Sequence, residues 1–331
     1  MEARQLWFTA EKQVDVIYSD LPALASNEIL VDASCSAISA GTELLVYRNQ
    51  FPKDLPLDAT LDSLGSDNCF QYPLRYGYAT VGQVSRSGEA VDPNLIGRPL
   101  FAFQPHASRF VIKASDGIFL PTDISLEDAL FLPNMETAVN LVQDGRPLLG
   151  ERVMVIGCGV VGLLTISLLA QFPLKQLVAV DLQTARLEAA SNCGAELAAR
   201  PEEMPAPPEA FDLVFELSGN PNALDTALQS VGYGGRIVIG SWYGEKRAPI
   251  NLGGRFHRNR IRLISSQVST IDPELSGRWD KERRFNVVLD QIREIGPSKW
   301  ISHRYSLEDA QSAYARLDQG HDNLLQVIFE Y

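Results

Sequence analysis

The sequence predicts an α/β protein of two domains, one an antiparallel barrel or sandwich and one a doubly wound parallel sheet. Its 331 residues suit two domains at roughly 100–200 residues each. Short alternating apolar runs separated by Gly and Pro fill the first third of the chain, as in antiparallel folds. After Pro121 strand and helix patterns alternate, which is typical of a parallel sheet covered by helices on both faces.

The composition excludes some classes of partner. Lys and Arg number 29 against 41 Asp and Glu, for a net charge of −12. Nucleic acid and anionic membranes attract clustered positive charge, so neither is expected as the main partner. No apolar run reaches the ~18 residues of a membrane span, and the N-terminus lacks a signal-peptide layout. We therefore expect a cytoplasmic protein.

The first domain is expected to consist mainly of short strands. The apolar runs that predict them occupy 14–18, 29–35, 78–84, 99–103 and 110–112. Residues 50–68 are rich in Asp, Leu and Pro and have no clean period, so we expect a surface loop or lid there.

The second part of the chain is expected to alternate strands and helices. Ser125 and Asp128 form a capping-box pattern. The elements expected after it are helix 135–144, strand 153–156, helix 160–171, strand 177–180, helix 184–192, strand 211–217, helix 220 to about 231, strand 235–240, a helix around 285–292, a helix from 306 and strand 326–329. Gly145 and Gly194 suit the position after a helix, and Pro173 ends another.

A glycine-rich turn joins the strand 153–156 to the helix that begins at Val160. Gly157, Gly159 and Gly162 form the pattern G-x-G-x-x-G. The first glycine allows a tight turn, the second lets the backbone approach a pyrophosphate, and the third lets the helix pack close to the sheet. The helix N-terminus supplies N–H groups and partial positive charge for phosphates. Strand, turn and helix together predict a dinucleotide site.

Asp181, at the end of the next strand, indicates which dinucleotide is bound. Its carboxylate can accept hydrogen bonds from both adenosine ribose hydroxyls and would repel a 2′-phosphate. No arginine follows it directly, and Arg186, one turn into the helix, can reach the ribose or stay solvated. The sequence therefore favours NAD(H) over NADP(H).

The chain resembles the medium-chain dehydrogenase/reductase superfamily over nearly its whole length. Besides the glycine motif, the similar segments are 38–44, 76–79, 134–137, 211–216 and 235–240. The resemblance implies a GroES-like barrel domain over 1–133 and 267–331 and a Rossmann domain over 134–266. The cofactor-binding residues expected from the motif and the resemblance are Thr137, Gly157, Cys158, Gly159, Val160, Val161, Gly162, Asp181, Leu182, Arg186, Leu217, Ser218, Ile239, Gly240 and Ser241.

The metal pattern of zinc-dependent members is absent. Where they place Cys, His and Cys, this sequence has Ala40, Tyr78 and, by spacing, Pro133, which cannot form a zinc site. The four-cysteine structural lobe is also missing, because 101–110 passes directly between two barrel strands. We therefore predict no zinc. The amino-acid sequences of residues 39–43, 73–78 and 132–137 most resemble those of the group that includes bacteriochlorophyllide hydroxyethyl dehydrogenases.

Without a metal, a side chain must handle the proton that accompanies hydride transfer. The candidates lie at positions where the resemblance places the catalytic site. Tyr78 occupies the ligand-histidine position, and Thr42 the place of a relay hydroxyl. His106 lies on the loop that replaces the zinc lobe, which is expected at the rim of the cleft. Glu136 can orient a donor. Each residue also has an alternative role outside catalysis. Tyr78 can fill space and Thr42 can be a structural hydroxyl, whereas His106 can be an inert loop histidine and Glu136 can form an ordinary salt bridge.

The leading hypothesis is a zinc-independent, NAD(H)-dependent oxidoreductase acting on a small secondary alcohol or ketone. One alternative is an enoyl or quinone reductase of the same superfamily. Another is a dinucleotide-binding protein without catalysis. The resemblance also implies a homodimer through the sheet edge around 250–265.

Overall fold

The computed structural model describes residues 2–54, 70–204, 210–320 and 324–331. The chain forms two compact units, Met1–Leu132 with Gly296–Tyr331 and Pro133–Ile295. Residues 267–295, which the sequence assigned to the barrel domain, group here with the parallel sheet. Most of the expected loop 50–68 lies outside the described residues.

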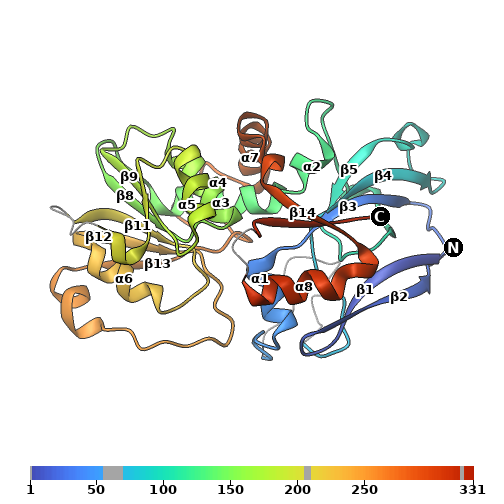
Figure 1. Ribbon diagram of the computed structural model, residues 1–331. Coiled ribbons are helices and arrows are strands. Elements are labelled where there is room, and N and C mark those ends of the chain that lie inside the picture. Colours follow the sequence, from blue (N-terminus) through green and yellow to red (C-terminus); the bar gives the residue numbers. More distant parts are fainter. Residues whose placement is uncertain (1, 55–69, 205–209, 321–323) are drawn as a thin grey trace. The chain divides into compact units, whose positions relative to one another are not determined.

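The first unit contains a seven-stranded sheet and a separate two-stranded hairpin (Figure 1). The hairpin pairs β1 (Glu2–Ala10) with β2 (Gln13–Asp20). The sheet strands are β3 (Glu28–Ala37), β4 (Thr80–Ser87), β5 (Pro99–Ala102), β6 (Arg109–Lys113), β7 (Ile118–Phe119), β14 (Ile301–Ser306) and β15 (Gln326–Glu330). They follow the order β14-β15-β3-β4-β5-β7, with β6 paired to β3. All pairs are antiparallel except β14–β15.

The described residues of the first unit also form three α-helices. They are α1 (Ala40–Tyr47), α2 (Leu126–Ala129) and α8 (Ala310–Gln319). The expected cap of α2 is confirmed, because the Ser125 hydroxyl accepts the Asp128 N–H at 3.0 Å. α8 packs on α1 and on β2, and its Tyr314 meets Phe8 of β1 edge to face at 5.2 Å. The last helix of the chain thereby closes a core against its first strand.

The second unit is a six-stranded parallel sheet in the order β10-β9-β8-β11-β12-β13. Its strands are β8 (Arg152–Ile156), β9 (Gln176–Val180), β10 (Leu197–Ala199), β11 (Phe211–Glu216), β12 (Val231–Ile239) and β13 (Arg262–Ser265). Its helices are α3 (Leu132–Gly145), α4 (Val160–Leu169), α5 (Thr184–Asn192), α6 (Ala223–Ser230) and α7 (Lys281–Ile295).

The strand order reverses between β8 and β11. α4 and α5 pack on the strands on one side of this reversal, and α6 packs on β11 and β12 on the other side (Figure 1). In doubly wound sheets the crevice at such a reversal, beyond the carboxyl ends of the strands, is where ligands bind. The glycine-rich turn follows β8 directly, so the sequence motif lies at this point.

The predicted fold class, an antiparallel GroES-like sheet with a doubly wound parallel sheet, is confirmed. The sequence analysis did not identify α1 or the short strands β7, β10, β13 and β14. In the part of the chain described here, no helix is both long and apolar enough to cross a membrane.

Candidate functional site

The glycine-rich turn is shaped by two close backbone approaches. Gly157 has φ +97°, and a Cβ there would lie 2.6 Å from the Leu217 carbonyl carbon. A Cβ on Gly162 would lie 2.0 Å from the Gly157 carbonyl oxygen. Gly159, in contrast, has open space where a Cβ would be, and no side chain caps α4 at this position. The turn is therefore tight where the helix meets the sheet and open where a ligand would approach the N-terminus of α4.

Asp181 is tied to the same turn. Its Oδ2 accepts the Cys158 N–H at 2.7 Å, and its Oδ1 accepts the Gln183 N–H at 2.9 Å. Each carboxylate oxygen can accept a further hydrogen bond. The carboxylate thus lies beside the glycine-rich backbone, as ribose recognition requires. Arg186, on α5, is near enough to lower the pKa of the Cys158 thiol, although burial raises that pKa more strongly.

The carboxyl ends of β11 and β12 are held by a buried carboxylate that the sequence analysis missed. Glu216 is fully buried, and its Oε1 accepts the Ser218 N–H at 2.8 Å. Its Oε2 accepts the Tyr243 hydroxyl at 2.5 Å. Burial and the neighbouring Glu216 raise the pKa of Tyr243. The Ser241 hydroxyl accepts the Gly219 N–H at 2.8 Å.

The expected residues 217, 218 and 239–241 therefore lie at the carboxyl-terminal ends of β11 and β12. Leu217 donates its N–H to the Ile156 carbonyl at 2.8 Å, which connects the end of β11 to the strand before the glycine-rich turn. The residues expected at the pyrophosphate, the ribose and the nicotinamide amide therefore follow adjacent strands. Leu182, which follows β9 next to Asp181, is 66% exposed.

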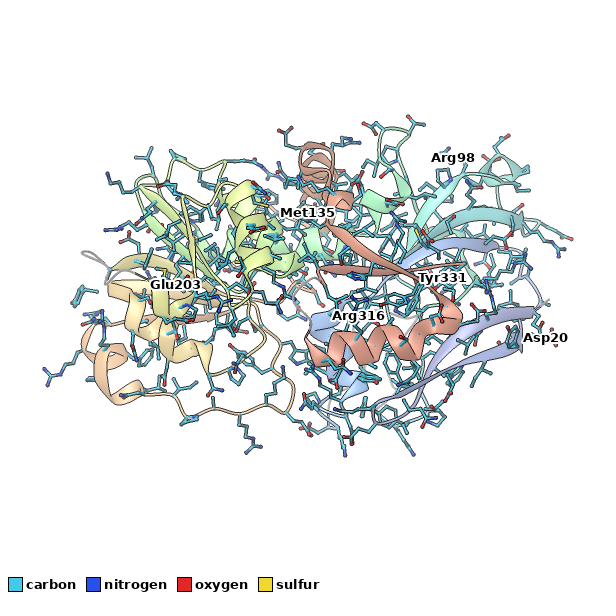
Figure 2. All side chains as sticks on the ribbon, viewed as in Figure 1. Asp20, Arg98, Met135, Glu203, Arg316 and Tyr331 are labelled. Carbon is cyan, nitrogen blue, oxygen red and sulfur yellow. The ribbon has the colours of Figure 1, made fainter. Side chains whose placement is uncertain are left out.

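Glu136 lies in the second unit and pairs with a buried arginine. Arg284 on α7 has no exposed surface, and its guanidinium donates to Glu136 Oε1 at 2.6 and 3.1 Å. It also donates to Asn140 Oδ1 at 2.6 Å and to the carbonyls of Val268 and Thr270. The described contacts of Glu136 are therefore those of the salt bridge considered as its alternative. Met135 marks this part of α3 in Figure 2.

Thr137, one position further along α3, donates its hydroxyl to the Pro133 carbonyl at 2.9 Å. This is the usual bond of a helical threonine to the preceding turn. The oxygen keeps acceptor capacity, so the bond is compatible with the expected cofactor contact.

In the first unit, Tyr78 and Thr42 lie close together. The half-buried Tyr78 hydroxyl is 3.3 Å from Thr42 Oγ1. It also donates a short hydrogen bond to the Ser39 hydroxyl. Ser39 is the N-cap residue of α1, and the sequence analysis did not single it out. We call Ser39, Thr42 and Tyr78 the hydroxyl cluster.

His106 is fully buried, whereas the sequence suggested the rim of a cleft. Its Nε2 lies 3.0 Å from Glu43 Oε2, and its Nδ1 lies 2.6 Å from the Ser36 hydroxyl. Gly77 makes room for the ring, because a Cβ there would lie 2.8 Å from two imidazole atoms. The ring also meets Phe329 edge to face at 5.1 Å.

The chain of polar contacts continues on both sides of His106. The Ser36 hydroxyl is 2.6 Å from the hydroxyl of Tyr331, the last residue of the chain (Figure 2). Tyr314 donates a short hydrogen bond to Glu43 Oε2, and Glu43 Oε1 accepts the Ser39 N–H at 2.7 Å. We call Ser36, Glu43, His106, Tyr314 and Tyr331 the histidine network. It touches the hydroxyl cluster at Ser39.

The described residues contain no group of three or more His, Cys, Asp or Glu side chains that could hold a metal. At the positions compared with zinc ligands, Tyr78 instead bonds to other hydroxyls. The donor set of this region therefore does not fit zinc, which prefers nitrogen and sulfur ligands. Zinc independence remains a prediction.

Comparison with known proteins supports the fold and the broad family. A family model described as zinc-binding dehydrogenase matches residues 160–282. D-guloside 3-dehydrogenase of Escherichia coli (strain K12) is 23% identical over 305 residues, covering 85% of each chain.

Two solved structures show the same fold with different dinucleotides. A short chain alcohol dehydrogenase of E. coli CFT073 complexed with NADH has a TM-score of 0.78 at 17% identity, covering 100% of this chain and 99% of that one. A protein of Sinorhizobium meliloti 1021 described as a zinc-binding dehydrogenase, bound to NADP, has the same TM-score of 0.78 at 17% identity and full coverage of both chains. The chain is therefore similar to zinc-binding dehydrogenases over residues 160–282, and it shares its fold with the two solved structures.

Proposed function

We propose that this chain is an NAD(H)-dependent, zinc-independent oxidoreductase that interconverts a secondary alcohol and a ketone. The observation that carries the proposal is the Asp181 carboxylate bonded to the backbone of the glycine-rich turn. A bound nicotinamide supplies or accepts the hydride. The chain's own residues bind the dinucleotide, place the substrate and move one proton.

Tyr78 is the proposed proton donor for ketone reduction. Its hydroxyl gives its proton to the carbonyl oxygen as the carbon accepts hydride, and the proton is replaced through Ser39 or Thr42. The hydrogen bonds of the hydroxyl cluster support this role because they already orient the phenol. General acid catalysis of this kind contributes typically 10²–10⁴-fold.

The proposed substrate is polyhydroxylated. D-guloside 3-dehydrogenase, galactitol 1-phosphate 5-dehydrogenase and sorbitol dehydrogenase are among the similar proteins, and the substrates in their names carry several hydroxyl groups. Within the superfamily we assign the chain to a zinc-less group similar to bacteriochlorophyllide hydroxyethyl dehydrogenases. The assignment rests on the amino-acid sequences of residues 39–43, 73–78 and 132–137.

We also propose a cytoplasmic homodimer that pairs through β13, the last strand in the order of the parallel sheet. Leu263 on this strand is 36% exposed, and Leu252, in the separate helical turn Leu252–Phe256 before it, is 46% exposed. An unpaired strand edge with apolar side chains favours pairing with a second copy. Sedimentation of the protein should give the mass of a dimer.

Titration with NADH and NADPH, followed by fluorescence, tests the cofactor assignment. We expect tighter binding of NADH, and a loss of about 10–100-fold in Asp181→Ser, since a hydrogen bond to a charged group contributes about 1.5–3 kcal/mol. Asp290→Ser, which alters an exposed carboxylate on α7, is the matched control. Preference of the unchanged protein for NADPH would contradict the assignment and favour the reductase alternative.

Turnover on a panel of polyols, ketones and enones tests the reaction class. We expect activity on polyols or their ketones, no stoichiometric zinc by elemental analysis, and a loss of at least 10²-fold in Tyr78→Phe. Activity confined to enones or quinones would favour the reductase alternative. NADH binding without turnover on any class would favour the non-catalytic alternative, and a full equivalent of zinc would refute zinc independence.

A further inference from the structure

Trp7 and Arg75 lie on neighbouring chain segments of the first unit, outside both the hydroxyl cluster and the histidine network. Phe8 on β1 (Figure 1) donates its N–H to the Leu74 carbonyl at 2.9 Å, and Leu74 returns the bond to Phe8 at 3.0 Å. In such an antiparallel bridge, the residue before one partner stands opposite the residue after the other. Trp7 and Arg75 are therefore cross-strand neighbours on one face.

That face is opposite the main core of the unit. Phe8 and Leu74 are buried members of the core that also contains Tyr314, and side chains alternate between the two faces of an extended segment. Trp7 and Arg75 are each partly buried. They are covered without belonging to the apolar core.

Both side chains bury an N–H group for which the described residues supply no acceptor. Trp7 Nε1 and Arg75 Nε have almost no exposed surface, and neither forms a hydrogen bond within the described part of the chain. Each of these N–H groups can only donate, since neither nitrogen has a free lone pair. Native proteins rarely leave buried donors unpaired. Two such donors on facing positions indicate that an acceptor from outside the chain binds there.

The charge of Arg75 limits what this acceptor can be. Burial lowers the pKa of Arg75, and no acidic side chain contributes to the shift. None of the ion pairs found in the described part of the chain includes Arg75. Arg284, the buried arginine of the second unit, has Glu136 as its partner. Among the residues that the structure describes, Arg75 has no such partner, although the whole chain contains 41 acidic residues.

We propose that Trp7 and Arg75 bind a small oxyanion, the carboxylate or phosphate group of a small molecule. A partly buried cation is also stabilised by an opposite charge with good hydrogen-bond geometry. A water molecule could accept the two N–H groups, but it would not neutralise the guanidinium. An oxyanion does both, and its hydrogen bonds to an arginine are charge-assisted. The ligand can be a free ion or the anionic group of a larger molecule.

The Trp7 indole N–H gives a direct readout of this site. In a ¹⁵N-labelled protein its resonance is assigned by its loss in Trp7→Phe, and it is followed during titration with inorganic phosphate, acetate or glucose 6-phosphate at constant ionic strength. We expect a saturable downfield shift with at least one of them, and at least tenfold weaker binding in Arg75→Met. Arg109→Met, which alters a half-exposed arginine paired with Asp32, is the matched control and should bind as the unchanged protein does.

The possible outcomes distinguish a free ion from the anionic group of a larger ligand, and both from failure of the proposal. Tighter binding of glucose 6-phosphate than of phosphate would identify a group of a larger ligand, and equal binding would identify a free ion. Arg75→Lys, which keeps the charge but not the Nε–H, provides a second variant if Arg75→Met does not fold. An indole resonance that none of the three anions moves, or that moves equally when Arg75 is replaced, would overturn the proposal.

Discussion

Replacing His106 by alanine is expected to destabilise the first unit strongly. The imidazole is fully buried and contacts Glu43 at 3.0 Å and Ser36 at 2.6 Å, both of which are also fully buried. Alanine removes both hydrogen bonds and leaves a cavity against Phe329. Water that could replace the lost partners has no open path to groups without exposed surface.

The magnitude follows from these losses. An unsatisfied buried polar group costs about 1–3 kcal/mol, and more if it is charged, and the change leaves both Ser36 and Glu43 with one partner fewer. We therefore expect a loss of about 2–5 kcal/mol in the free energy of unfolding. At about 2–4 °C per kcal/mol for a unit of this size, the midpoint of thermal unfolding should fall by about 4–20 °C.

Thermal unfolding followed by circular dichroism measures this shift, with His303→Ala as the matched control. His303 on β14 is half-buried, and its Nδ1 lies 3.1 Å from the hydroxyl of the adjacent Ser302, so its replacement should cost much less than that of the fully buried His106. Replacing Glu43 by leucine together with His106→Ala should add less than the two single changes summed, since the residues share one network. Equal midpoints for His106→Ala and His303→Ala would refute the argument.

Three further predictions concern the second unit. Gly162→Ala should weaken NADH binding at least tenfold, because its Cβ would lie 2.0 Å from a backbone oxygen, whereas Gly253→Ala, with 3.9 Å to its nearest neighbour, should bind normally in the same fluorescence titration. Burial and the nearby Asp181 raise the pKa of Cys158, so its thiol should resist iodoacetamide at pH 8 in the native protein; rapid labelling seen by peptide mass spectrometry would contradict this. Arg284→Met should cost about 3–5 kcal/mol in urea unfolding, and Arg293→Met on the same helix, half-exposed, should cost far less.

The dinucleotide turn could be predicted because its residues are close in sequence. Gly157, Gly162 and Asp181 fall within 25 positions of one another, and each has a role fixed by local geometry. The strand before the turn and the helix after it show their own periodicity. The structure has the expected strand, turn and helix, and it adds a bond between Asp181 and the turn that the sequence did not predict.

The histidine network could not be predicted, because its contacts join distant parts of the chain. Ser36 and Tyr331 are 295 residues apart, and Glu43 and Tyr314 are 271 residues apart. No spacing rule connects such positions, and only the packing of the last helix and strand against the first strands brings them together. Glu136 and Arg284, 148 residues apart, have the same origin.

The link between the histidine network and the hydroxyl cluster leads to a last prediction. Glu43 Oε1 accepts the Ser39 N–H, and the Ser39 hydroxyl accepts the hydrogen bond of Tyr78. Loss of His106 frees Glu43 to move, and Ser39 loses its fixed position. His106 would then act as a positioning residue, and not as the proton donor considered from the sequence.

Steady-state kinetics with a substrate found in the panel can separate these roles. If His106 positions Ser39, His106→Ala at a temperature well below unfolding should lower kcat about 10-fold, less than the 10²–10⁴-fold expected for Tyr78→Phe, and leave the affinity for NADH in the second unit unchanged. Ser39→Ala should show the same decrease, and the double variant should show no further loss, because both changes remove one interaction. A multiplicative loss in the double variant would mean that His106 acts on the reaction by a route independent of Ser39.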